Sequence, residues 1–195
     1  MNKYSSLFFL TLLLIIGSCN NTENIKDSNS IKKIDDKEIK KENLPDVIKN
    51  YSIGIEVIHS PDTIYAELNG NGTSKYIWKH STTVTAINND LKIIEFGSYN
   101  FIDNKWVLGN YSKIPFNSED FSKWYCRKKN GIITFDYCKD GKIKKKVEYV
   151  DPSNYSIRKD SLVNRNGLWY YIGIDSIGNK FVGYGRYVIV GKLKN

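Results

Sequence analysis

The sequence is poor in the residue types that most often build metal and nucleophilic sites. Its 195 residues include 2 His and 3 Cys, and the two histidines, His59 and His80, do not form a spaced pair suited to a metal. No HExxH, CxxC, GxSxG or glycine-rich phosphate loop occurs. His59, Ser60 and Asp62 lie close together, but a triad is defined by geometry rather than adjacency, and Pro61 favours a turn there. We therefore predict no metal site and no cofactor, and we assign no catalytic residue.

Long apolar runs are also scarce, and the longest stands at the N-terminus. Residues 7–16 are nearly all apolar, follow the positive Lys3, and precede the small residues Gly17 and Ser18. This is the layout of a secretory signal. The run is about half of the roughly 20 residues that a membrane-spanning helix needs. Export followed by cleavage is therefore favoured over a retained transmembrane anchor.

The end of this segment resembles the lipobox of bacterial lipoproteins, in which an aliphatic residue and two small residues precede a cysteine. Ile16, Gly17, Ser18 and Cys19 match it position by position. The resemblance implies that residues 1–18 are a signal peptide and that Cys19 becomes the first residue. Cys19 would then carry a thioether-linked diacylglycerol and an amide-linked acyl chain such as palmitate, and several chains give stable attachment.

The resemblance also implies a membrane-anchored location in the bacterial cell envelope. The outer membrane is the expected membrane, and the leaflet stays open. An ordinary cleaved signal with a coincidental cysteine is the alternative.

Residues 19–50 have the composition of a tether. They contain no aromatic residue, and residues 26–49 contain seven Lys against six Asp or Glu. Such a segment buries too little apolar surface to offset the entropy of ordering. We predict a disordered, charged linker that lets the folded domain move away from the lipid-bearing Cys19.

Residues 51–195 read as one β-rich globular domain. Short apolar or alternating runs are separated by turn residues, as in an antiparallel β-sandwich, with a small β-barrel as the alternative. One short helix is expected after Ser118, which would cap it. The last two strands have apolar residues on both faces and should be central. The expected strands are Ser52–Ile58, Thr63–Leu68, Lys75–Lys79, Thr82–Ile87, Leu91–Ile102, Lys105–Tyr111, Gly131–Cys138, Lys142–Val150, Gly167–Asp175 and Lys180–Lys192.

Positive charge is concentrated in one segment of this domain. Residues 123–146 contain nine Lys or Arg against two Asp. They also contain Cys126 and Cys138, which an oxidising compartment would pair. A disulfide there would close a loop of about 13 residues and stabilise the fold by roughly 3 kcal/mol. Two free buried thiols are the alternative.

A hairpin turn at Asp140 and Gly141 would place aromatic rings beside lysines on one face of this segment. It would also set Asp136 opposite Lys145. Such a face suits an anionic glycan, a lipid headgroup or an acidic protein. The alternative is that the lysines protect an edge strand from pairing with another chain. The residues of this predicted binding face are Phe135, Tyr137, Lys142, Lys144, Lys145 and Lys146.

Taken together, these features favour a noncatalytic, membrane-tethered module that binds a ligand or another envelope component. A small hydrolase of glycans or cell-wall material is one alternative, and it requires a cleft with two convergent carboxylates. Glu67, Glu95 and Glu148 are candidates on strands. A structural or inhibitory partner of another envelope protein is the second alternative. Nucleic acid is disfavoured as a partner, because an exported chain does not meet cytoplasmic nucleic acid and no recognition motif occurs.

Overall fold

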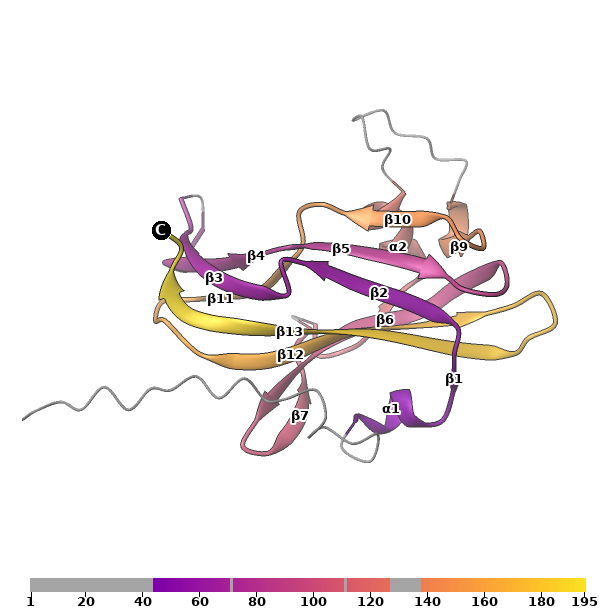
Figure 1. Ribbon diagram of the computed structural model, residues 1–195, viewed down its shortest axis with the longest axis horizontal. Helices are drawn as coiled ribbons and strands as arrows, with labels where there is room; N and C mark the ends of the chain where they lie inside the picture. The colour runs from indigo at the N-terminus through magenta and orange to yellow at the C-terminus, as the bar shows by residue number, and fades with distance from the viewer. Residues whose placement is uncertain (1–43, 71, 111, 127–137) are drawn as a thin grey trace, which may run out of the picture. The chain divides into compact units, whose positions relative to one another are not determined.

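The computed structural model describes residues 44–70, 72–110, 112–126 and 138–195 (Figure 1). The signal segment, Cys19, most of the tether and the expected strand Gly131–Cys138 up to Tyr137 therefore lie outside the described residues. With that strand, Phe135, Asp136 and Tyr137 also lie outside. No helix of the described part is long and apolar enough to cross a membrane.

The domain is mainly β, as the alternation predicted, and its largest sheet is curled. Strands run through this sheet in the order β11-β4-β3-β13-β12-β6-β7, and β1, β8 and β9 pair at its margins. The sheet is mixed, because β13 pairs in parallel with β1 and β3 and antiparallel with β12. Its strands are β1 (Ser52–Ile53), β3 (Thr63–Leu68), β4 (Tyr76–Lys79), β6 (Leu91–Ile102), β7 (Lys105–Leu108), β8 (Phe116–Asn117), β9 (Lys142–Ile143), β11 (Tyr155–Lys159), β12 (Arg165–Ile174) and β13 (Lys180–Leu193).

A second, antiparallel sheet has the order β10-β5-β2. Its strands are β2 (Ile55–Ser60), β5 (Ser81–Ala86) and β10 (Glu148–Asp151). Strand β2 lies against β13, where the backbone carbonyl of Ile55 faces Gly183 and that of Val57 faces Gly185. A Cβ at Gly183 would stand 2.2 Å from the Ile55 oxygen. The two glycines therefore let one strand cross closely over the other.

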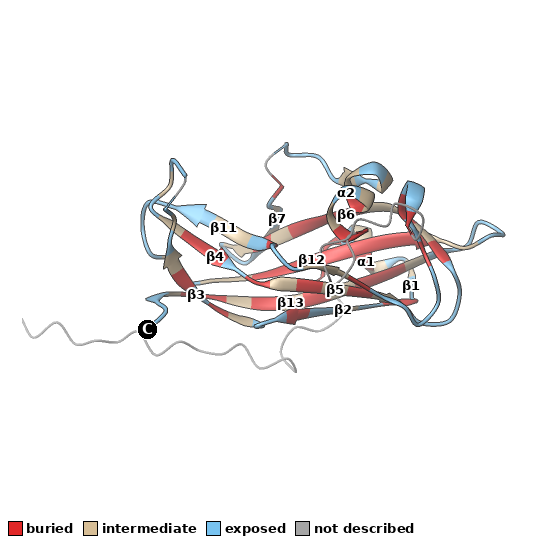
Figure 2. Cartoon of the chain, turned by 90° about the horizontal axis from the view of Figure 1, so that it is seen from above, coloured by how far each residue is buried: buried red, intermediate tan, exposed pale blue. Residues whose placement is uncertain are grey.

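The main core lies on one side of β12 and β13, and β12 is buried over most of its length (Figure 2). Trp169 and Tyr171 point to this core together with Phe96, Phe121 and Tyr125. The alternate residues of β12 belong to a second cluster on the opposite face, which contains Leu168, Tyr170, Ile172 and Val182. Apolar residues on both faces thus mark a central strand, as expected.

The second cluster also includes the end of the predicted tether. Leu44 and Ile48 are 3% and 2% exposed, and the short helix α1 (Asp46–Lys49) lies between the tether and β1. The prediction that the linker extends to residue 50 is therefore wrong at its end. These isolated apolar residues cover the outer face of β12 and β13.

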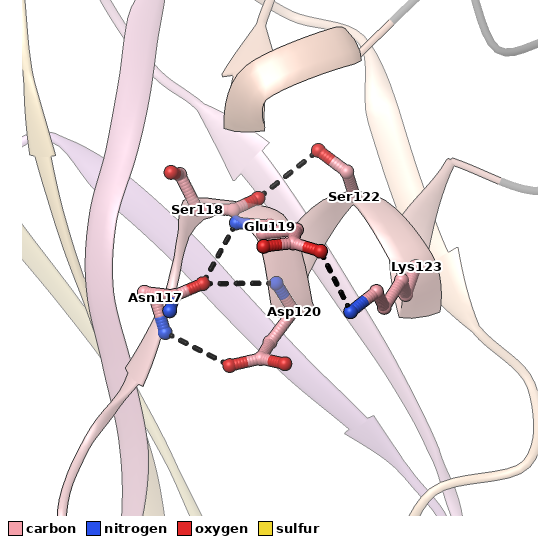
Figure 3. A network of polar contacts seen from close by, with 6 residues as sticks. All are labelled: Asn117, Ser118, Glu119, Asp120, Ser122 and Lys123. Carbon is pink, nitrogen blue, oxygen red and sulfur yellow. Dashed lines mark hydrogen bonds and ion pairs between the residues drawn. The ribbon is translucent and has the colours of Figure 1, made fainter.

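The helix α2 (Ser118–Tyr125) forms at the predicted place, but its N-cap residue is Asn117 and not the predicted Ser118. The Asn117 side chain accepts hydrogen bonds from the backbone N–H groups of Glu119 and Asp120, at 2.9 and 3.1 Å. Asp120 in return accepts the backbone N–H of Asn117 (Figure 3). This reciprocal pair is a capping box. Ser118 was the predicted cap, and its backbone carbonyl instead accepts the Ser122 hydroxyl.

The predicted strand Lys142–Val150 is wrong as a single element. Asp140 and Gly141 do have positive φ angles of 60° and 76°, the conformation that a type I′ turn requires. After them only β9 continues, paired with the start of β6, before the chain turns at Lys146, where φ is 61°. Strand β10 then joins the other sheet. The regular alternation expected over this stretch is therefore interrupted, and Val147 is exposed while Tyr149 is buried.

Candidate binding pocket

A pocket of about 330 Å³ opens between α2, the large sheet and the segment that joins β10 to β11. Five separate parts of the chain contribute to it. Its lining comes from β6 (Ser98), the segment after β7 (Gly109, Asn110), β8 and α2 (Phe116, Trp124), β12 (Trp169), and the stretch from the end of β10 to the start of β11 (Asp151, Ser153, Asn154, Tyr155, Ser156).

Three aromatic side chains form one wall of this pocket. The ring centroids of Phe116 and Trp124 are 4.7 Å apart, and the Trp169 ring lies 6.2 and 6.3 Å from these two. Phe96, which is fully buried, packs behind all three at 5.2 to 6.2 Å. Such pairs prefer tilted and edge-to-face arrangements, so the wall is held in a defined geometry.

The Trp169 indole nitrogen is buried behind this wall. The residue is 5% exposed, and its Nε1 atom is closed to solvent and has no acceptor within the described residues. A buried donor without an acceptor costs roughly 1–3 kcal/mol. Trp169 therefore contributes the surface of its ring to the pocket rather than a hydrogen-bond donor.

The part of the lining from Asp151 to Ser156 is held by hydrogen bonds. Asp151 accepts the backbone N–H of Ser153 at 3.0 Å, and the Asn154 side chain accepts that of Tyr155 at 2.8 Å. The carbonyl of Asn154 accepts the backbone N–H of His80 at 3.0 Å. These contacts hold the backbone between Asp151 and Tyr155 and tie it to the residue after β4.

A buried polar chain extends from Asn154 into the domain. The Asn154 amide donates to Thr82 Oγ1 at 2.8 Å, and Thr82 Oγ1 lies 3.0 Å from His59 Nδ1. His59 Nε2 lies 3.0 Å from the Gly185 carbonyl, which can only accept, so Nε2 carries the proton and Nδ1 accepts from Thr82. Burial lowers the pKa of His59 to about 4.

His80 stands beside this chain. Its ring centroid is 5.0 Å from that of His59 and 5.5 Å from that of Tyr187. Its Nδ1 lies 3.1 Å from the Ser156 hydroxyl. Burial, with a smaller contribution from His59, lowers the pKa of His80 to about 3. Both rings are therefore neutral at pH 7, and His80 also lines the second hollow described next.

A second, more open hollow of about 600 Å³ adjoins the pocket, and the two share Ser153 and Tyr155. Lys79, Arg158 and Lys194 line it together with the carboxylate of Glu67. Glu67 lies 3.3 Å from Lys79 and 3.2 Å from Lys194. The Arg158 guanidinium stands 4.2 Å from the centre of the Tyr155 ring. We call these spaces the aromatic pocket and the basic hollow.

The carboxylates proposed for a glycan hydrolase do not converge. Glu67 pairs with lysines, which outweigh its desolvation and lower its pKa. Glu95 accepts the Tyr170 hydroxyl at 2.8 Å, and Glu148 is exposed on β10. In the described part of the chain, Asp151 is the single carboxylate that lines the aromatic pocket. These three glutamates therefore do not form the closely spaced carboxylate pair that glycoside hydrolysis uses.

The lysines of the predicted basic face lie elsewhere. Lys142 and Lys144 line a hollow of about 490 Å³ that also holds Lys92 and Lys139. Three carboxylates, those of Asp90, Asp140 and Asp175, share this hollow. Lys145 and Lys146 are exposed in the turn that follows. The positive charge of this surface is therefore interspersed with negative charge.

The two cysteines of the domain are joined in the structure. Cys126, at the end of α2, forms a disulfide with Cys138, and their Cα atoms are 5.5 Å apart. This bond ties α2, which carries Trp124, to the turn before β9. Among the described residues, no cluster of His, Cys, Asp or Glu is arranged to hold a metal ion.

Sequence reasoning did not identify the aromatic pocket. Its residues lie on segments far apart in the chain, and no sequence motif marks Trp124 or Trp169 as binding residues. Comparison with known proteins adds no relative: no protein-family model matches the chain, and no curated protein or solved structure matches it significantly.

Proposed function

We propose that this chain is a lipid-anchored binding protein of the bacterial cell envelope. Lipid on Cys19 would hold it at a membrane, and the aromatic pocket would bind a ligand without changing it chemically. The pocket carries the binding half of the proposal, because it combines three packed aromatic rings with a carboxylate and several hydroxyl and amide groups. Ligand sites in proteins commonly have this mixture of apolar walls and a few placed polar groups.

The anchoring half is supported by the order of Ile16, Gly17, Ser18 and Cys19. It is tested by the intact mass of the protein purified from the membrane fraction. The expected mass is that of a chain starting at Cys19 plus diacylglycerol and an acyl chain. The Cys19→Ala variant should leave the membrane fraction. A native product that begins at Met1 would contradict the proposal.

The binding half is tested with the detergent-solubilised native protein. Trp124 and Trp169 line the pocket, so a bound ligand should change the intrinsic tryptophan fluorescence. Trp124→Ala should shift that change to about tenfold higher ligand concentration or remove it. Trp106, on β7 in the other cluster, gives the matched control, and Trp106→Ala should bind normally. If every response to ligands survives in Trp124→Ala at unchanged ligand concentration, the pocket is not the binding site.

A further inference from the structure

We infer that the ligand is an acidic oligosaccharide, with one sugar ring in the aromatic pocket and an anionic neighbouring unit across Tyr155 in the basic hollow. This inference rests on the proposed binding function and adds the chemical class of the ligand.

The size and walls of the pocket favour a single sugar ring. A pyranose has faces made of C–H groups, which pack on aromatic rings, and an edge of hydroxyl groups, which form hydrogen bonds. Trp124 and Phe116 are half-buried and line the pocket, so part of their ring surface can take such a face. Its volume of about 330 Å³ lies at the low end of the roughly 300–1,000 Å³ found for ligand pockets. One ring fits that space better than a chain of rings.

The polar groups of the pocket favour a ligand that forms several hydrogen bonds. Ser98, Ser153 and Ser156 line it with hydroxyl groups, which donate and accept, and a carboxylate such as that of Asp151 can accept more than one hydrogen bond. A hydrocarbon supplies no hydrogen-bond partner. A quaternary ammonium group would suit the rings and the carboxylate, but its positive charge does not suit the neighbouring basic hollow. Sugar hydroxyl groups donate and accept at neighbouring positions.

The basic hollow extends the site in one direction. It begins at Tyr155, which is 40% exposed and lines both spaces, so a chain leaving the aromatic pocket there passes directly into the hollow. The hollow has three cationic side chains against the single carboxylate of Glu67. Arg158 is exposed and makes a planar donor that suits a carboxylate group of a ligand. The next unit is therefore expected to carry negative charge, as a uronic acid does.

The test uses the detergent-solubilised native protein and tetrasaccharides of galacturonate, of alginate and of hyaluronan. Each is compared with its methyl ester, which keeps the sugar and removes the charge. At least one acidic tetrasaccharide should bind, and it should bind more tightly than its ester. Trp124→Ala or Trp124→Leu should weaken binding by about tenfold or more. Asp151→Asn should also weaken it, with unchanged binding in Trp106→Ala as the control.

The basic hollow is tested separately with Arg158→Gln. This variant should weaken the acidic tetrasaccharide severalfold and leave the ester unchanged. Lys159→Gln is the matched control, because Lys159 is exposed on the same strand but does not line the hollow. Equal affinity for acid and ester would overturn the inference of an acidic ligand. Circular dichroism of each variant shows whether it is folded.

Failure of this inference can be told apart from failure of the proposed function. The fluorescent dye anilinonaphthalene sulfonate serves as a probe that is not a sugar. If no saccharide binds while the dye binds in a manner that depends on Trp124, the sugar assignment is wrong and the pocket still binds ligands. If neither saccharides nor the dye depend on Trp124, both proposals fail.

Discussion

Mild acid should destabilise this domain, because two histidines are buried without charge. His59 and His80 are 7% and 4% exposed. Their pKa values fall from 6.5 to about 4 and about 3, mainly through burial. The groups facing them are Asp62, whose charge slightly favours protonated His59, and the neutral Thr82, Ser156 and Tyr187. None of them offsets the cost of burying an imidazolium.

Whether acid raises or lowers the stability depends on which state, folded or unfolded, binds more protons. Below pH 6.5 the unfolded chain takes up a proton on each histidine, whereas the folded domain does not until the pH approaches 4 and 3. Stability is therefore fully present above pH 6.5 and is lost as the pH falls toward those values. Between pH 7 and 5 each histidine should lower the free energy of unfolding by about 2 kcal/mol, about 4 kcal/mol for both. Glu67, with its lowered pKa, contributes only at lower pH.

The assay is urea unfolding followed by circular dichroism at intervals from pH 7 to 5. The control is His80→Phe, which keeps an aromatic ring against Tyr187 and cannot titrate. Its free energy of unfolding should fall about half as much over the same range. The reasoning would be refuted by a free energy that stays constant from pH 7 to 5, or by an unchanged pH slope in His80→Phe.

Three further results are expected from unfolding measurements. Asn117→Ala should lower the free energy of unfolding by about 1 kcal/mol because the capping box of α2 is lost, and Ser118→Ala should lower it by less. A larger effect of Ser118→Ala than of Asn117→Ala would contradict the assignment of Asn117 as the cap. Gly183→Ala should cost about 3 kcal/mol or abolish folding, since its Cβ would meet a β2 carbonyl at 2.2 Å. Gly70→Ala, where no atom lies within 4 Å, should be close to neutral. Reducing the disulfide should cost about 3 kcal/mol, and an identical urea midpoint with and without reductant would argue against that stabilisation.

Much of the β architecture could be predicted because strands leave a local pattern. Thr63–Leu68 and Leu91–Ile102 form with the predicted bounds, since turn residues flank their apolar runs. The strand Tyr155–Lys159 was missed. It is an edge strand with mostly exposed or half-buried residues, so no apolar alternation marks it.

Errors arose where distant contacts override local preference. Lys142–Val150 alternates like one strand, but its two ends pair with different sheets, and the chain turns at Lys146 between them. Leu44 and Ile48 resemble the isolated apolar residues of a tether, yet a face of the large sheet is available to bury them. Neither outcome is encoded within a few residues of sequence.

The sequence alone determined the mainly β class, the central position of the last two strands and the place of α2, because each depends on the spacing of apolar and turn residues along a short segment. The lipid-anchor prediction also comes from the sequence alone, through a local motif at Cys19. Only the tertiary structure decided the aromatic pocket. Trp124, Asp151 and Trp169 come from a helix, a strand end and a central strand, and their proximity depends on how the two sheets and α2 pack. That packing is a property of the whole domain, so no local pattern could reveal it.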